Sequence, residues 1–162
     1  MDFSLTDEQR AIRDMARTFA QEELIPNCTE FDRLPDGEDS FPWDLVKRGS
    51  ELGFNALAVP EKYGGSGADV LTQCIVIEEL SAGEPAVSKV YSHNWKALFG
   101  LMAIASEEQV QRVVPGFLED PGYCISIGMT EPNTGSDNSL PYSGTLAAGP
   151  NLSAVRQGSH YV

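Results

Sequence analysis

The sequence predicts a mainly α-helical fold, in which a five-helix bundle is followed by the first strand or strands of a β-domain. Three observations lead to this prediction. Capping signatures at Thr6 and Ser106 precede amphipathic stretches, long apolar stretches between them keep the helical period, and a short β-branched segment follows Pro121–Gly122. The composition agrees, because 162 residues with 41% hydrophobic and 22% charged side chains can build one substantial core.

The first predicted helix begins after Thr6, which forms a capping-box signature with Gln9. Acidic residues in its first turn suit the helix dipole. We expect Pro26 to end this helix. A polar, turn-rich connection covers 31–42, and a short second helix covers 42–52. The apolar stripe of the first helix recurs at helical spacing: Ile12, Met15, Ala16, Phe19 and Ala20.

A glycine-rich loop follows the second helix, which Gly53 should stop. The loop leads to Asp69, which we expect to cap a buried helix over 70–82. Such a loop could cradle a phosphate, but neither the Lys-Ser/Thr pair of a P-loop nor a dinucleotide fingerprint accompanies it. We therefore interpret it as a structural connection. Its glycines are Gly64, Gly65 and Gly67.

The fourth helix follows the break at Glu84–Pro85, and its apolar residues on more than one face predict the centre of the bundle. Ser106 caps a fifth helix, in which Pro115 should produce a kink. One apolar face of the fourth helix consists of Trp95, Leu98, Phe99, Met102 and Ala103.

The character of the chain changes after the fifth helix. The stretch Tyr123–Thr130 is short, β-branched in places and bounded by turn residues, which predicts the first strand of a new domain. The sequence thus predicts a helical domain over 1–121 and the start of a β-domain over 122–162.

Charge and cysteine content narrow the function classes. Eleven basic against twenty-four acidic residues give a net charge of −13, which disfavours nucleic acid and anionic lipid as partners. No apolar run approaches the roughly 18 residues of a membrane span. Three separated cysteines, Cys28, Cys74 and Cys124, form neither a disulfide framework nor a metal-binding spacing. We expect a reducing, cytoplasmic environment.

The order of the motifs resembles one family. The capped first helix, VPEKYGGSG, IEELSAG, SEEQVQR and the strand followed by TEPNTGSD are similar to the N-terminal helical domain and the start of the β-barrel-like middle domain of acyl-CoA dehydrogenases. The resemblance covers essentially the whole chain. It implies an FAD-dependent α,β-dehydrogenation of an acyl-CoA thioester, an electron-accepting flavoprotein as partner and a tetrameric assembly.

The resemblance also implies a flavin contact in TEPNTGSD. Thr130 would present its hydroxyl and amide to the flavin ring, and Ile127 and Met129 would add backbone contacts. Gly135 would allow close approach of the backbone, since it has no Cβ. Ser136 would reach the junction between FAD and the substrate's pantetheine arm. Taken alone, the same residues are equally consistent with a turn that is stabilised by side-chain hydrogen bonds.

A second set of residues lies on the fourth helix. In the family this stretch faces the acyl pocket, so the resemblance implies that Val90, His93, Asn94 and Ala97 bind substrate, together with Ser136. Polar groups there would favour an acyl group that is not a plain alkyl chain. The alternative is that His93 is a helix-surface histidine satisfied by its neighbours.

The chain also departs from the family pattern. The connection over 138–153 is longer than the family's usual one, beside the CoA side of the site. The family continues beyond Val162, and its catalytic carboxylate belongs to that further part. We therefore assign no catalytic or metal-binding residue here, and expect this chain to supply one wall of a site completed by a missing part or a partner chain. The alternatives are a non-catalytic flavin- or acyl-CoA-binding subunit that completes another chain's site, and an acidic helical interaction module.

Overall fold

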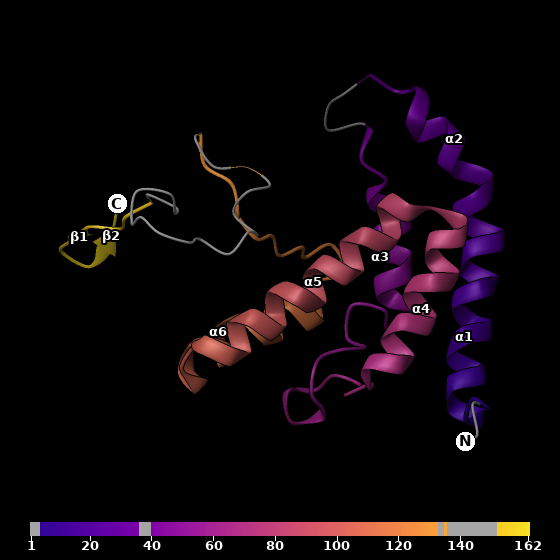
Figure 1. Cartoon of the computed structure of the whole chain (residues 1–162), viewed down its shortest axis with the longest axis horizontal. Helices are drawn as coiled ribbons and strands as arrows, with labels where there is room; N and C mark the ends of the chain where they lie inside the picture. The colour runs from indigo at the N-terminus through magenta and orange to yellow at the C-terminus, as the bar shows by residue number, and fades with distance from the viewer. Residues whose placement is uncertain (1–3, 36–39, 133–134, 136–151) are drawn as a thin grey trace, which may run out of the picture. The chain divides into compact units, whose positions relative to one another are not determined.

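The computed structural model describes residues 4–35, 40–132, 135 and 152–162. The chain forms two units, Met1–Ser126 and Ile127–Val162. The domain boundary at 121/122 stays a prediction. The first unit is helical (Figure 1) and contains α1 Asp7–Phe19, α2 Ile25–Arg33, α3 Trp43–Glu51, α4 Val70–Gly83, α5 Pro85–Ile104 and α6 Glu107–Glu119.

The start of α1 confirms the predicted capping box. The Thr6 hydroxyl accepts from the Gln9 backbone N–H at 3.1 Å, and the Gln9 side chain accepts from the Thr6 N–H at 3.1 Å. The prediction that Pro26 ends this helix is wrong. A π-helical turn over Ala20–Leu24 joins α1 to α2, and Pro26 falls in the first turn of α2. A proline is tolerated there, because the missing N–H is not needed in a first turn.

The connection between α3 and α4 depends on its glycines. Gly53, at φ +94°, follows the end of α3, as predicted, and Gly64 also adopts a left-handed conformation at φ +92°. A Cβ on Gly65 would lie 2.1 Å from the Val59 carbonyl oxygen. Asp69 then caps α4, because its carboxylate accepts from the Thr72 N–H at 2.7 Å. Hydrogen bonds with the side chain and the backbone of Thr72 lower the pKa of the Asp69 carboxyl group.

We expect Gly65→Ala to lower the free energy of unfolding by about 2–4 kcal/mol, because its methyl group would overlap a backbone carbonyl that has little room to move. Urea unfolding measures the change. The matched control is Gly100→Ala in α5, where a Cβ meets nothing within 4 Å. That change should raise stability by about 0.5–1 kcal/mol, since alanine favours a helix over glycine. Equal effects of the two substitutions would contradict this account of Gly65.

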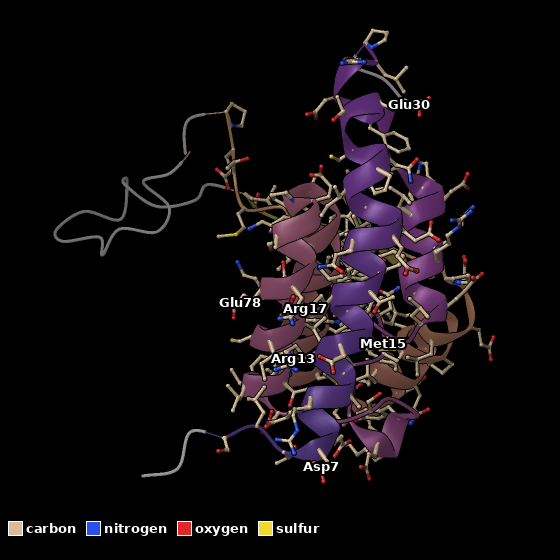
Figure 2. The ribbon with its side chains drawn as sticks, turned by 90° about the vertical axis from the view of Figure 1, so that its right-hand side faces the viewer. Asp7, Arg13, Met15, Arg17, Glu30 and Glu78 are labelled. Atoms are coloured by element: carbon tan, nitrogen blue, oxygen red, sulfur yellow. The ribbon has the colours of Figure 1, made fainter. Side chains whose placement is uncertain are left out.

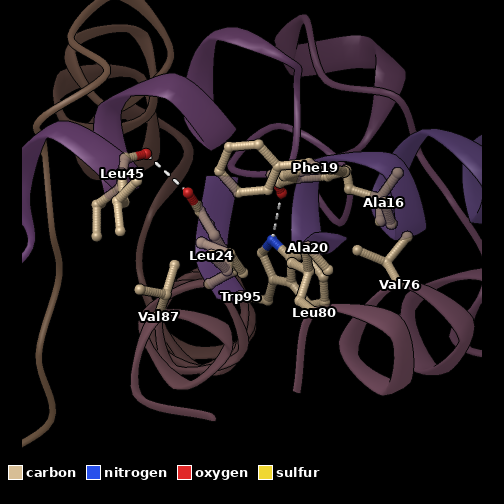
Figure 3. Packing of buried hydrophobic residues seen from close by; sticks show 13 residues of the cluster. Ala16, Phe19, Ala20, Leu24, Leu45, Val76, Leu80, Val87 and Trp95 are labelled. Carbon is tan, nitrogen blue, oxygen red and sulfur yellow. Dashed lines mark hydrogen bonds between the residues drawn. The ribbon is translucent and has the colours of Figure 1, made fainter. Parts of the chain in front are cut away.

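The core forms where α1 packs on α4 and α4 packs on α5 (Figure 1). At the surface of the first contact, Arg17 of α1, labelled in Figure 2, forms a two-pronged ion pair with Glu79 of α4. Figure 3 shows the apolar side chains of this core gathered between the helices. Its buried members include Ala16, Phe19, Ala20, Leu24, Leu45, Val46, Phe54, Val76, Leu80, Val87, Tyr91 and Trp95.

Two buried side chains of α5 donate hydrogen bonds to backbone carbonyls of α3 and of the turn that follows it. The Trp95 Nε1–H donates to the Phe54 carbonyl at 2.9 Å, and the Tyr91 hydroxyl donates to the Val46 carbonyl at 2.7 Å. Burial raises the pKa of Tyr91, so its hydroxyl stays protonated as a donor. These bonds orient α5, which carries the residues predicted to bind substrate.

The last helix confirms its predicted cap as well. The Ser106 N–H donates to the Gln109 side chain at 2.8 Å, and the Ser106 hydroxyl accepts from the Gln109 N–H at 3.3 Å. α6 continues through Pro115, and the kink there stays a prediction. Its buried side chains form a smaller cluster with Val59 and Leu98.

The second unit contains two short antiparallel strands, β1 Arg156–Gln157 and β2 His160–Tyr161. The fold class is therefore confirmed, since a helical unit is followed by the beginning of β-structure. The prediction of a strand over Tyr123–Thr130 is wrong, since the structure shows none of these residues in a strand. A strand needs a hydrogen-bonding neighbour, and the local β-propensity of this segment does not supply one.

Within the parts of the chain that the structure describes, no helix combines the length and the apolar character needed to cross a membrane.

Candidate functional site

A hollow beside α5 contains three of the four residues predicted on that helix to bind substrate. Its volume is about 340 Å³, and Val90, His93 and Asn94 line it. Ala97 lies one turn further along α5, only 8% exposed, and is not part of the lining. The hollow lies between α5, the start of α3 and the segment after α6, and its remaining lining residues are Phe41, Trp43, Ala86, Lys89, Cys124 and Ile125.

The walls of the hollow are largely apolar. Phe41 and Trp43 pack against each other with ring centroids 4.5 Å apart and planes tilted by 56°. Ala86, Val90 and Ile125 complete the apolar surface. A hollow of this volume with a few polar groups is typical of a small-molecule site.

His93 contributes a polar group of defined orientation. Its Nδ1 lies 3.2 Å from the Lys89 carbonyl oxygen, which can only accept, so Nδ1 carries the proton and Nε2 is the acceptor of the neutral ring. Burial lowers the pKa of His93, and the positive charges of Lys89 and Lys96 lower it further. The neutral ring is satisfied by its own helix through Nδ1 and lines the hollow as well.

Asn94 has a structural task that the sequence analysis missed. It is 1% exposed; its Nδ2 donates to the Asn55 Oδ1 at 2.9 Å, and its Oδ1 accepts from the Ile125 N–H at 2.9 Å. The side chain therefore joins α5, the turn after α3 and the segment after α6. Its spacing from Tyr91, Trp95 and Leu98, all of which are buried, could have indicated an internal amide.

The cysteine of the hollow is not activated, and the described residues offer no metal centre. Burial raises the pKa of Cys124, which keeps this lining residue a neutral thiol. No group of three or more His, Cys, Asp or Glu side chains in the described ranges could hold a metal ion.

The residues predicted to contact the flavin belong to the second unit. Ile127 and Met129 are 40% and 49% exposed, and Thr130 is exposed. Among the described residues, a Cβ at Gly135 would meet nothing within 4 Å, and the predicted close approach to the flavin stays a prediction. Ser136 lies outside the described residues.

Within the first unit, the structure brings Val90, His93 and Asn94 to one hollow. Ile125 lines the hollow and Ile127 follows two positions later, a span of at most about 7 Å along an extended chain.

Comparisons with known proteins agree with one another. The model of the acyl-CoA dehydrogenase N-terminal domain matches residues 6–120. The probable acyl-CoA dehydrogenase YngJ of Bacillus subtilis is 34% identical over 166 residues, which cover 100% of this chain and 39% of the relative. The short-chain specific acyl-CoA dehydrogenase of Clostridium acetobutylicum is 34% identical over 164 residues, again covering 100% and 39%. The chain thus spans about two fifths of the length of these relatives.

Solved structures show the same similarity. A chain in the structure of the electron transferring flavoprotein of Acidaminococcus fermentans has a TM-score of 0.79 and 31% identity, over 100% of this chain and 39% of that one. Glutaryl-coenzyme A dehydrogenase in its glutaryl-CoA complex has a TM-score of 0.74 and 30% identity, over 85% and 34%.

Proposed function

The chain belongs to the acyl-CoA dehydrogenase family, and on this premise we propose that it forms one wall of the flavin and acyl site of an FAD-dependent acyl-CoA dehydrogenase. The reaction would remove hydrogen from the α and β carbons of an acyl-CoA thioester. One observation supports this most: Val90, His93 and Asn94 line a single hollow, and Ile125 from the segment leading to the flavin residues lines it too.

The residues present fit the edge of a flavin. Thr130 is exposed and carries a hydroxyl and a backbone N–H, the two kinds of group that can donate to a ring acceptor; Ile127 and Met129 are 40% and 49% exposed. When bound, FAD would supply the two-electron acceptor chemistry that side chains lack. Hydrogen-bond donors placed at such a ring stabilise the negative charge that develops there.

The acyl side would exclude water. The Phe41–Trp43 pair and the aliphatic wall of the hollow can cover an acyl chain, and the neutral His93 offers an acceptor at Nε2. The base that takes the α-proton would lie outside this chain, in a further segment or in a partner. A cytoplasmic tetramer that delivers electrons to an electron-accepting flavoprotein completes the proposal.

A second candidate is a non-catalytic subunit that offers the same hollow and the same flavin-side residues to another chain's site. It shares with the first candidate the expectation that the catalytic base lies outside this chain. Thioester-dependent chemistry at the bound flavin separates the two candidates.

The test uses the protein expressed from its own locus, with whatever further segment or partner accompanies this chain. We expect it to carry yellow flavin whose absorbance bleaches when acyl-CoA is added without oxygen. Bound flavin that no acyl-CoA bleaches would favour the non-catalytic subunit. A colourless assembly that takes up no added FAD would contradict both candidates.

In that protein, we expect Thr130→Val to slow flavin reduction or weaken flavin binding by about 1–3 kcal/mol, because it removes one donor to the ring and keeps the side-chain size. Stopped-flow reduction and equilibrium dialysis of FAD measure the two quantities. The control is Thr18→Val, which makes the same chemical change at an exposed position of α1. Unchanged flavin affinity together with an unchanged reduction rate would refute the role of Thr130.

A further inference from the structure

The charge of α5 differs from that of the rest of the chain. The whole chain carries a formal charge of −13, yet α5 contains no Asp or Glu between Pro85 and Ile104. It contains two of the four lysines of the sequence, Lys89 and Lys96. Neither lysine forms an ion pair among the described residues. The helix is therefore locally cationic in a strongly acidic protein.

The two lysines lie on the same side of α5 as His93, and one of them, Lys89, lines the hollow. Lys89, His93 and Lys96 are spaced by four and three residues, which places them along one side of an α-helix. Lys89 and His93 both line the hollow, and the pKa of His93 is lowered by both lysines, after burial. That coupling indicates that the field of the two lysines extends to the ring beside the hollow.

The lining of the hollow contains no acidic side chain to neutralise this field. Among its nine residues, Lys89 carries the one ammonium group, while Cys124 stays a thiol and His93 a neutral ring. A positive charge beside a mainly apolar wall attracts an anion more strongly than it would in open water. The hollow thus combines a surface for a hydrocarbon chain with a group that binds an anion.

We propose that the hollow takes the acyl part of a CoA thioester whose far end carries a carboxylate, and that Lys89 binds this carboxylate. The inference rests on the proposed function and specifies its substrate class. A volume of about 340 Å³ lies in the usual range of ligand sites. The similar proteins leave the choice open, since one is named short-chain specific and another was solved with glutaryl-CoA.

Two other uses of Lys89 are chemically reasonable, and the test separates them. Its ammonium group could extend to solvent over a plain alkyl chain, with only the aliphatic stem against the ligand. It could instead bind a phosphate of the CoA moiety. The first use gives no preference for a carboxylate, and the second affects every acyl-CoA equally.

The experiment compares glutaryl-CoA with hexanoyl-CoA, a neutral substrate of similar length, by kcat/KM in the flavin-loaded protein expressed from its own locus. We expect glutaryl-CoA to be preferred. Lys89→Met, which keeps an unbranched side chain and removes the charge, should lower kcat/KM for glutaryl-CoA about 10- to 100-fold. The value for hexanoyl-CoA should change less than about threefold, as neutral ligands do not use the charge.

Two variants control this result. Lys89→Arg retains the charge and should retain most of the preference for glutaryl-CoA. Lys62→Met makes the same charge change on the surface, where Lys62 lies 3.9 Å from Glu107, and should alter neither substrate.

An unchanged glutaryl-to-hexanoyl ratio in Lys89→Met would overturn the inference. An equal loss for both substrates would also overturn it and would indicate a contact with the CoA phosphates. Both results leave the proposed function standing, because acyl-CoA turnover would still be observed. Absence of turnover with every acyl-CoA tested, in the unsubstituted protein, would refute the proposed function itself.

Discussion

Replacing Asn94 with Leu is expected to lower the free energy of unfolding by about 2–5 kcal/mol, because the buried Asn55 amide and the partly buried Ile125 N–H lose their partner at once. The Ile125 N–H would lose its acceptor, and the Asn55 side chain would lose the amide that donates to its Oδ1. The Asn55 Nδ2 already has no hydrogen-bond partner among the described residues, so no bond at Nδ2 would offset the loss of the bond at Oδ1. Urea unfolding measures the loss.

The same substitution should release the segment after α6. Hydrogen exchange at the Ile125 amide is the direct readout, and its protection should fall well beyond the change caused by global destabilisation. The control is Ser92→Ala on the same helix, where an exposed hydroxyl donates to the Lys89 carbonyl at 3.1 Å. That variant should stay within about 0.5 kcal/mol of the original. Unaltered protection of Ile125 in Asn94→Leu would contradict the role given to Asn94.

The second large effect concerns residues 1–162 taken alone. We expect this piece to fold at least in its helical unit, to retain almost no FAD and to reduce no dye with any acyl-CoA. The proposed base is absent from it, and a flavin held on one side would remain largely in water, where hydrogen bonds and charges act weakly. Absorbance at the flavin band after gel filtration, together with a dye-reduction assay, measures both losses.

Adding the further segment or partner that the proposal requires, as a fusion or as a separate chain, should restore the yellow colour and turnover. Restoration by this addition also controls for misfolding of the isolated piece. Acyl-CoA-dependent dye reduction by residues 1–162 alone would show that a base lies within this chain.

Local signals in the sequence predicted three helix starts correctly, those of α1, α4 and α6. The capping residues Thr6, Asp69 and Ser106 all act within three residues of their partners, so no tertiary information is needed to find them. Pro26 also gives a local signal, but the rule failed there. The π-helical turn over Ala20–Leu24 carries the helix past it, and Leu24 in that turn is fully buried in the core.

The site was predictable only in part, because local patterns do not indicate contacts between residues that lie far apart in the sequence. Helical periodicity and the family resemblance placed Val90, His93 and Asn94 on one helix, and they do line one hollow. The partners of Asn94 lie 39 and 31 residues away, which no local pattern indicates. The part proposed for Lys89 likewise depends on the aromatic pair of Phe41 and Trp43, which lines the same hollow from the start of α3 and the residues before it.

The most direct test of the central claim is photoaffinity labelling of the flavin-loaded protein with an acyl-CoA that carries a diazirine at its acyl end. The account predicts labels in two peptides, one covering Ala86–Asn94 and one covering Cys124–Ile125, and predicts that unlabelled acyl-CoA suppresses both. Suppressible labelling confined to other parts of the chain, or to partner segments alone, would contradict the claim that this hollow forms a wall of the acyl site.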